Sequence, residues 1–221
     1  MNKDEARRKV SEIAGEHFRR GDPVGWFEAL YQQSAGDASW IPWADMQPNP
    51  MLVEWFEREK IKSGGKSAVV IGCGLGDDAE YLAAMGYQVT AFDIAPSAVD
   101  WCKQRYPQTR VNYQVADLFT LSPNWLFDLV VEIYTVQALP TVFRERAITS
   151  LSRLVETGGY LLAIGRYANS PDEQDLMPWP LTREELDGYT RAGLNEIQVE
   201  VFHDQQTPPV RRFRALYRRS T

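Results

Sequence analysis

Apolar positions follow two different periods along the chain, and the change of period divides it near residue 65. Before that point apolar side chains recur at helical spacing, which predicts helices over residues 3–20, 24–34 and 50–60. A loop rich in Trp and Pro, residues 40–50, joins the second helix to the third. After that point short apolar runs alternate with helical patterns, which is typical of a parallel sheet with helical crossovers.

The second part of the chain predicts strands at residues 67–71, 88–92, 110–115, 126–133, 159–166, 197–203 and 212–219. Helices are expected at residues 77–85, 96–105, 141–154 and 182–191. The fold class that follows is α/β, with a doubly wound, mostly parallel seven-stranded sheet and an antiparallel C-terminal edge strand. We expect a helical cap over residues 1–65 and a core over residues 66–221, packed as one compact unit.

The first predicted strand runs into a glycine loop, Gly72-Cys73-Gly74-Leu75-Gly76-Asp77-Asp78. Glycines let a ligand approach the backbone closely. The dinucleotide fingerprint G-x-G-x-x-G requires glycine where Asp77 stands, and a carboxylate there would repel a pyrophosphate. A cationic or zwitterionic nucleoside therefore fits this loop better than NAD, which disfavours an NAD-dependent oxidoreductase. Capping of the next helix is the structural alternative for Asp77 and Asp78.

Carboxylates also follow the next two predicted strands. Asp93 closes the second strand, where it can accept hydrogen bonds from both ribose hydroxyls or cap the following helix. Asp117 follows the third strand, where it can accept an adenine amino group, with Leu118 or Phe119 against the ring, or stabilise a turn. The fourth strand, within residues 127–134, ends at the switch point where open α/β sheets bind ligands.

These elements, in this order and spacing, resemble the class I S-adenosylmethionine-dependent methyltransferases over about residues 66–166. Residues 156–162 look like that family's turn before the fifth strand, with Glu156-Thr157 where Lys-Pro is usual. The resemblance implies a Rossmann-like methyltransferase fold and S-adenosylmethionine as cofactor. It implies cofactor contacts from Gly72, Cys73, Gly74, Gly76, Asp78, Asp93, Ile94, Asp117, Leu118, Glu132 and Ile133.

The N-terminal part looks like the start of the thiopurine methyltransferase-like enzymes, a group that includes thiol and halide methyltransferases. The similarity lies in Gly25-Trp26, Tyr31, Pro42-Trp43 and Pro48-Asn49-Pro50. In that group a cap closes over the cofactor, which implicates Trp26, Tyr31 and Trp43. The spacing from Trp26 to Trp43 departs from the group and needs insertions, so a surface flap without a substrate role is the alternative.

The resemblance implies methyl transfer to a small-molecule acceptor. A thiol or another soft nucleophile is favoured because it needs no general base, and the sequence identifies no catalytic residue. An oxygen or nitrogen acceptor would need a base, for which Glu132, Tyr134 and Asp45 are the candidates. Aromatic faces and one arginine are expected to bind the acceptor, from Trp40, Tyr134, Gln137, Arg166, Tyr167 and Trp179.

Composition and charge restrict the class of partner. The chain has 221 residues, 44% of them hydrophobic, and a formal net charge of -6, which fits a globular protein and disfavours nucleic acid. No apolar run approaches the ~20 residues of a membrane span. Two cysteines, one inside the glycine loop, and two histidines far apart in sequence predict neither a disulfide nor a metal site.

We therefore expect a cytoplasmic monomer or homodimer that binds no nucleic acid, membrane or metal. Two alternatives remain open at this point. A methyltransferase for a larger protein or RNA acceptor predicts a basic rim around the cleft. A non-catalytic protein that binds S-adenosylmethionine would have kept the fold without the reaction.

Overall fold

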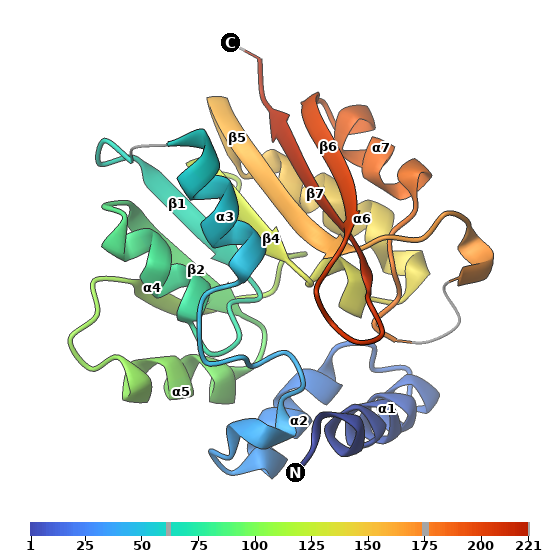
Figure 1. Ribbon diagram of the computed structural model, residues 1–221. Helices are drawn as coiled ribbons and strands as arrows, with labels where there is room; N and C mark the ends of the chain where they lie inside the picture. Colours follow the sequence, from blue (N-terminus) through green and yellow to red (C-terminus); the bar gives the residue numbers. More distant parts are fainter. Residues whose placement is uncertain (61–62, 174–176, 221) are drawn as a thin grey trace.

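The computed structural model describes residues 1–60, 63–173 and 177–220. A seven-stranded sheet with strand order β3-β2-β1-β4-β5-β7-β6 forms its centre (Figure 1). The strands are β1 (Ser67–Ile71), β2 (Gln88–Asp93), β3 (Asn112–Val115), β4 (Phe127–Ile133), β5 (Val155–Arg166), β6 (Asn195–His203) and β7 (Arg211–Arg218). The first five strands pair in parallel, whereas β7 is antiparallel to both β5 and β6.

The predicted α/β class, the seven strands and the reversed C-terminal strand are confirmed. The predicted edge position of that strand needs correction, because β7 lies between β5 and β6 and leaves β6 at the edge. Burial explains the order. Phe213, Ala215 and Tyr217 of β7 are fully buried, whereas β6 leaves Ile197 and Val201 exposed. The strand with the more continuous apolar run therefore takes the interior position.

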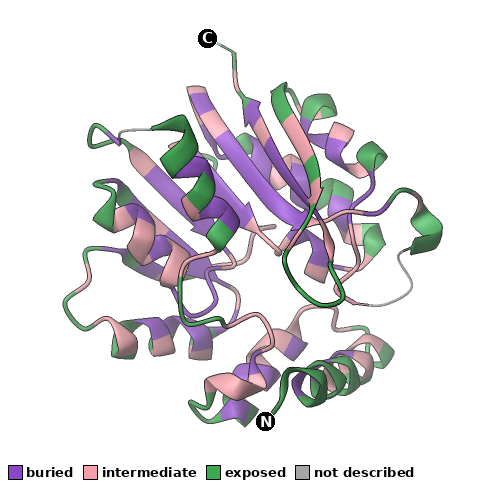
Figure 2. Ribbon diagram, viewed as in Figure 1, coloured by how far each residue is buried: buried purple, intermediate pink, exposed green. Residues whose placement is uncertain are grey.

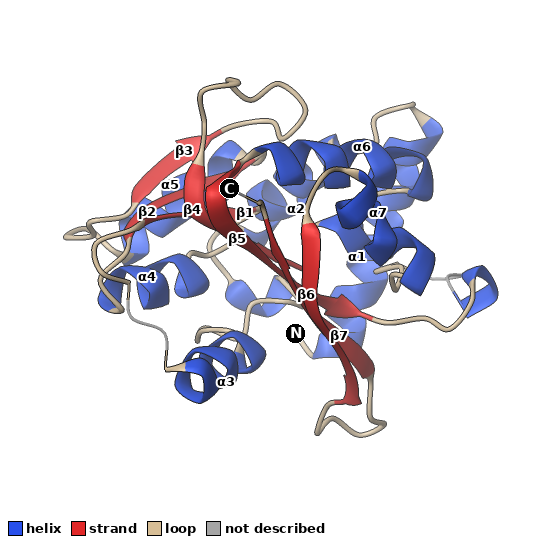
Figure 3. Ribbon diagram, turned by 90° about the horizontal axis from the view of Figure 1, so that it is seen from above, coloured by secondary structure: helices blue, strands red, loops and turns tan. Residues whose placement is uncertain are grey.

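Seven helices surround the sheet in the part of the chain that the structure describes: α1 (Lys3–Arg19), α2 (Gly25–Ser34), α3 (Pro50–Glu59), α4 (Asp77–Ala84), α5 (Pro96–Arg105), α6 (Thr141–Arg153) and α7 (Arg183–Arg191). One apolar cluster joins α3, α4 and α5 to the sheet, and another joins α6 and α7 to its opposite face (Figure 3). The strands between them are largely buried, as Figure 2 shows. None of the described helices is long and apolar enough to cross a membrane.

The fifth strand begins at Val155, earlier than the predicted residue 159. Phe127 of β4 pairs with Val155 but Leu129 pairs with Tyr160, so residues 156–159 form an irregularity in the ladder. Gly158 has a positive φ of 80° there. The turn that resembled the family's signature is thus a bulge within the strand, not a loop before it.

Helices α1 and α2 lie across the carboxyl ends of the parallel strands (Figure 1). Their apolar faces, including Val10 and Trp26, pack with Leu75 of the glycine loop and Ala98 of α5. Within the predicted N-terminal unit only these two helices and the loop after them take this position. The third helix, α3, packs on the sheet instead.

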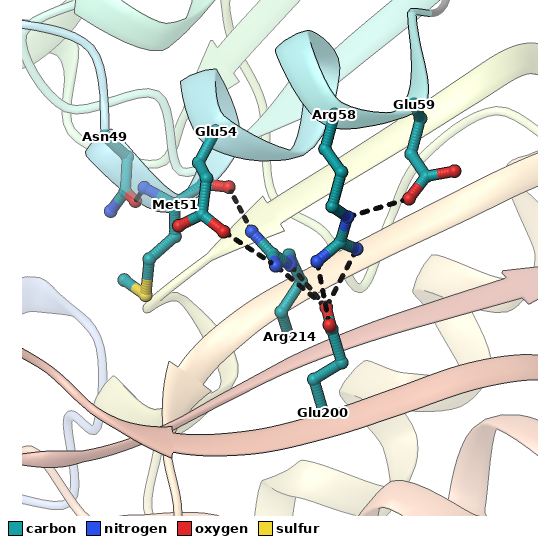
Figure 4. Close-up of polar contacts among 7 residues, drawn as sticks. All are labelled: Asn49, Met51, Glu54, Arg58, Glu59, Glu200 and Arg214. Atoms are coloured by element: carbon teal, nitrogen blue, oxygen red, sulfur yellow. Dashed lines mark hydrogen bonds and ion pairs between the residues drawn. The ribbon is translucent and has the colours of Figure 1, made fainter.

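Polar contacts hold α3 against β6 and β7 (Figure 4). The Arg214 side chain is nearly inaccessible, and it donates hydrogen bonds to the Met51 carbonyl at 2.9 Å and to Glu200 at 2.8 Å. Glu200 also accepts hydrogen bonds from Arg58 at 2.8 and 3.1 Å. The Asn49 side chain caps α3 by accepting the Met51 N–H at 3.0 Å. The start of α3 is therefore fixed beside the carboxyl ends of the strands.

Candidate active site

A cavity of about 550 Å³ lies between the strand ends and the N-terminal cap. The ends of four parallel strands line it through Ile71, Asp93, Ile133 and Arg166. Helices α1 and α2, the loop that follows them and the β6–β7 loop complete its wall. The volume falls in the range of small-molecule and cofactor sites.

The glycine loop forms one wall of the cavity in a conformation that favours glycine. Gly72 and Gly74 have φ values of 58° and 54°. A Cβ atom on Gly72 would lie 2.6 Å from the Thr135 hydroxyl, and one on Gly74 would face the Tyr31 hydroxyl at 3.4 Å. Glycine therefore lets Thr135 and Tyr31 approach the backbone of this loop closely. Cys73 also lines the cavity, and its N–H donates to the Phe92 carbonyl at 2.9 Å.

Asp93 connects the glycine loop to the start of α5. Its carboxylate is 6% exposed and accepts the Gly74 N–H and the Ala95 N–H, both at 3.0 Å. Burial raises the pKa of Asp93 to about 6, against the opposing effect of these two donors. A carboxylate has about four acceptor positions, so acceptor capacity remains for a ligand hydroxyl. Asp93 thus assists the start of the helix and still has capacity to bind a ligand.

The two acidic residues after the glycine loop have separate partners. Asp77 accepts two hydrogen bonds from Arg105 at 2.8 Å and one from the Tyr106 hydroxyl at 2.9 Å, which fastens the loop to α5. Asp78 accepts the Asn49 N–H at 2.6 Å, and burial raises the pKa of Asp78 to about 6. Neither side chain caps α4, whose N-cap is Gly76.

The ribose and adenine side of the predicted site lies along β2 and the loop after β3. Ile94, Asp117 and Leu118 all line the cavity. The Asp117 carboxylate accepts the Phe119 N–H at 2.9 Å, which is the turn that the sequence offered as an alternative. This contact leaves further acceptor positions on Asp117.

Aromatic side chains from the cap face the glycine loop. The Trp43 indole donates to the Tyr31 hydroxyl at 3.2 Å, and the rings of Trp26 and Trp43 meet edge to face with centroids 6.2 Å apart. The indole N–H of Trp26 is buried without a hydrogen-bond partner. These three residues line the cavity with aromatic rings.

Tyr134 marks the other end of the cavity, just after β4. Its φ is 65°, which is uncommon for a residue with a side chain and is often found at functional sites. Its hydroxyl accepts a hydrogen bond from the Asn49 amide at 3.2 Å, and the Arg212 guanidinium lies 5.2 Å from its ring centroid. Burial raises the pKa of Tyr134, so the phenol is neutral at physiological pH.

Gln137 and Arg166 extend this end of the cavity. The side-chain oxygen of Gln137 accepts the backbone N–H of Arg166 at 2.7 Å. The backbone carbonyl of Gln137 accepts the backbone N–H of Trp179 at 2.9 Å. The Nε atom of Arg166 is buried without a partner. Burial lowers the pKa of Arg166, and the charges of Arg212 and Arg7 lower it further.

All the predicted site residues line the cavity except four. Glu132 is 1% exposed, accepts the Val136 N–H at 3.1 Å and packs on the α6–α7 side of the sheet, because neighbouring strand residues point to opposite faces. Trp40 lies under the Lys9 ammonium, and Tyr167 lies under the Arg211 guanidinium. Trp179 packs near Phe18 with ring centroids 6.0 Å apart.

The structure also adds lining residues that sequence reasoning missed: Lys3, Arg7, Val24, Phe27, Asn49, Thr135, Asp204 and Arg212. Asn49 stood inside a noted Pro-Asn-Pro segment, and Thr135 directly follows the fourth strand, so both had a local signal. The charged residues of α1 and the β6–β7 hairpin had none, because only the tertiary fold brings them to the strand ends.

Comparison with known proteins identifies the class. A family described as a methyltransferase domain matches residues 69–163. The chain is 28% identical over 167 residues to 2-heptyl-1-hydroxyquinolin-4(1H)-one methyltransferase of Mycobacteroides abscessus, covering 72% of each chain. It is 25% identical over 169 residues to thiocyanate methyltransferase 1 of Brassica oleracea, covering 72% of this chain and 74% of that protein.

The fold agrees with a solved structure of the same class. The N-methyltransferase NodS from Bradyrhizobium japonicum WM9, in complex with S-adenosylhomocysteine, superposes with a TM-score of 0.65 at 21% identity, over 88% of this chain and 98% of NodS. A methyltransferase domain therefore spans residues 69–163, and the relatives support a class I S-adenosylmethionine-dependent methyltransferase. Its cofactor is S-adenosylmethionine, and the glycine loop, the remaining acceptor capacity of Asp93 and the aromatic side chains of the cap suit that molecule.

Proposed function

We propose that this methyltransferase acts on a small molecule with a soft, easily ionised nucleophile, foremost a thiol. The observation that carries this proposal concerns the carboxylates of the cavity. Every acidic side chain among the described lining residues already accepts a hydrogen bond, namely Asp45, Asp77, Asp78, Asp93, Asp117 and Asp204. No histidine or glutamate lies among the described lining residues. An acceptor that is ionised in solution needs no such base.

The chain's residues then bind, orient and desolvate the two reactants. Asp93 receives the ribose hydroxyls, and Ile94, Asp117 and Leu118 hold the adenine. Trp26, Tyr31 and Trp43 lie against the cationic part of the cofactor, where aromatic faces attract positive charge. S-adenosylmethionine supplies a methyl group on a sulfonium, so that the thiolate forms a new S–C bond while the old one breaks, leaving a thioether and S-adenosylhomocysteine.

An acidic hydroxyl is the second candidate nucleophile. The relative from Mycobacteroides abscessus is named for a hydroxylated quinolinone, and the one from Brassica oleracea for thiocyanate. Both names fit acceptors that ionise without a strong base. They leave the reacting atom of this protein's acceptor to experiment.

The test is a two-stage assay on the full chain. Calorimetry should first detect binding of S-adenosylmethionine and S-adenosylhomocysteine. Release of S-adenosylhomocysteine should then be measured with aromatic and aliphatic thiols, thiocyanate, halides, phenols, hydroxyquinolinones and amines. We expect the highest kcat/KM with thiols. Turnover of amines alone would overturn the soft-nucleophile proposal, and turnover of none despite cofactor binding would favour a non-catalytic binding protein.

A further inference from the structure

The guanidinium of Arg166 has no acidic partner among the described residues, whereas Arg212, which lines the same cavity, is paired with Asp204. Among the described residues the Arg166 guanidinium makes no hydrogen bond or ion pair, and its Nε is buried without a partner. The backbone of Arg166 is nonetheless held by two hydrogen bonds. Its backbone N–H donates to the side chain of Gln137 at 2.7 Å, and its backbone carbonyl accepts the backbone N–H of Leu181 at 2.9 Å. A rigidly mounted arginine with free donors is suited to bind an anion.

Other cations surround the same end of the cavity. Arg212 and Arg7 line it, and their charges act unfavourably on Arg166. Arg212 is paired with Asp204 at 2.8 Å, and the ion pair that Arg7 makes among the described residues is with the exposed Asp4, at 3.1 Å. Asp204 is therefore engaged with Arg212, and the charge of Arg166 is left without an acidic partner among the described residues at this end of the cavity. Since gathering cations in a partly buried site is unfavourable, a bound anion would stabilise it.

We propose that the methyl acceptor carries a separate anionic group, such as a carboxylate, that binds Arg166 with support from Arg7 and Arg212. This inference rests on the proposed function and specifies the acceptor within it. Arg166 is then a specificity-determining residue, not a part of the chemistry. The cations stand beside Asp45 and Asp204 within one cavity, so they form a local anion site and not the extended basic rim that an RNA acceptor would require.

The carboxylate of the cofactor itself is the competing occupant of this anion site. The strand order argues against it. Gly74 follows β1 and Asp93 ends β2, whereas Arg166 ends β5, and β4 lies between β1 and β5. With neighbouring strands about 4.8 Å apart, Arg166 is offset by two strand spacings from β1, on the side away from Asp93. That position suits the acceptor's end of the cavity.

A charge-matched pair of acceptors tests the inference. The wild-type enzyme should be compared on 4-mercaptobenzoate and on its methyl ester, which present the same thiol with and without a carboxylate. We expect kcat/KM to favour the acid by roughly tenfold to a hundredfold, in line with a hydrogen bond to a charged group. Arg166→Gln should remove most of that preference, and Arg166→Lys should retain part of it. Arg211→Gln, which removes a charge beside Arg212 from a residue outside the lining, should leave the preference unchanged.

Two binding measurements separate the possible failures. S-adenosylmethionine should bind Arg166→Gln within about twofold of its wild-type affinity; weaker cofactor binding with an unchanged acid-to-ester ratio would assign Arg166 to the cofactor and overturn the inference. Binding of 4-(methylthio)benzoate and its methyl ester to the complex with S-adenosylhomocysteine needs no turnover. If neither thiols nor acidic hydroxyls are methylated, the proposed function fails, while equal binding of these two ligands would still refute the anion site.

Discussion

The proposed cofactor site depends most directly on Asp93, because its carboxylate reaches both the glycine loop and α5. Asp93→Asn keeps one oxygen acceptor but removes the charge. We expect the affinity for S-adenosylmethionine to fall by about 1.5–3 kcal/mol, or roughly tenfold to a hundredfold in Kd, because hydrogen bonds to charged groups have this strength. Isothermal calorimetry at pH 7.5 measures the change.

Asp128→Asn is the matched control, because that carboxylate accepts hydrogen bonds from Ser67 at the opposite end of the sheet. Its cofactor affinity should match that of the wild type. The pKa of Asp93 of about 6 adds a pH dependence, since protonation removes the charged acceptor. Wild-type affinity should therefore decline below about pH 6, and Asp93→Asn should lack that decline. Equal affinities at all pH values would assign Asp93 to the loop alone.

Glu132 provides a separate prediction on stability. Burial raises the pKa of Glu132 from 4.5 to about 8. The folded protein therefore holds this proton up to about pH 8, while the unfolded chain releases it above about 4.5. The contribution of Glu132 to stability is complete below the unfolded-state pKa of 4.5 and is lost as pH rises through the folded-state pKa of about 8. Glu132→Gln cannot ionise, so its free energy of unfolding relative to wild type should rise by up to about 1.4 kcal/mol per pH unit between pH 5 and 8.

Urea unfolding of both proteins at pH 5, 6, 7 and 8 checks the Glu132 prediction. Glu145→Gln, on the exposed surface of α6, should show no pH-dependent difference from wild type. A constant offset between Glu132→Gln and wild type at all four pH values would mean that Glu132 titrates normally despite its burial.

Most of the residues that the sequence predicted for the site line the cavity, and the exceptions have a physical cause. Glycines and strand-end carboxylates such as Gly74 and Asp93 can be placed from the sequence, because the motif fixes where they lie relative to the strands. The resemblance implied a cofactor contact from Glu132, but side chains alternate between the two faces of β4, and Glu132 points to the face that α6 and α7 cover. Trp40 ends a three-residue 3-10 helix and Trp179 lies in a loop, and such short segments have no periodicity that predicts the direction of a side chain.

At the scale of the elements, Arg214 joins α3 to the two C-terminal strands. We expect Arg214→Met to lower the free energy of unfolding by about 2–4 kcal/mol, because the Met51 carbonyl loses its buried donor while Glu200 keeps Arg58. Chemical denaturation measures the loss. Arg218→Met, at the exposed end of β7, should change stability by less than about 1 kcal/mol. Equal losses in the two variants would contradict a structural role for the Arg214 contacts.

The elements themselves were predictable because hydrophobic period and glycine or proline boundaries are local signals. All helix ends fall within one residue of the predicted ranges. The position of β7 inside the sheet was not predictable from the sequence. It depends on which of the two hairpin strands, β6 or β7, buries both of its faces in the folded protein. Nor could the sequence place α3 on the sheet, because its docking depends on Arg214 and Glu200, more than 140 residues away in the chain.

At the scale of the whole molecule, the cavity exists only where the N-terminal cap meets the core, because α1, α2 and the glycine loop all line it. A ligand that fills it should therefore stabilise both parts. We expect S-adenosylhomocysteine to slow amide hydrogen exchange in α2 as well as in residues 72–78. At a hundred times its Kd it should stabilise the fold by about 2.7 kcal/mol and raise Tm accordingly.

Two controls, the exposed end of α6 and the variant Asp93→Asn, test whether the protection by S-adenosylhomocysteine is specific to the cavity. Local exchange at the exposed end of α6, which does not line the cavity, should change least. Asp93→Asn at the same ligand concentration should lose protection in both α2 and the glycine loop, since both depend on one bound molecule. Protection limited to the glycine loop would show that the cap does not contact the ligand, and would remove Trp26, Tyr31 and Trp43 from the cofactor site.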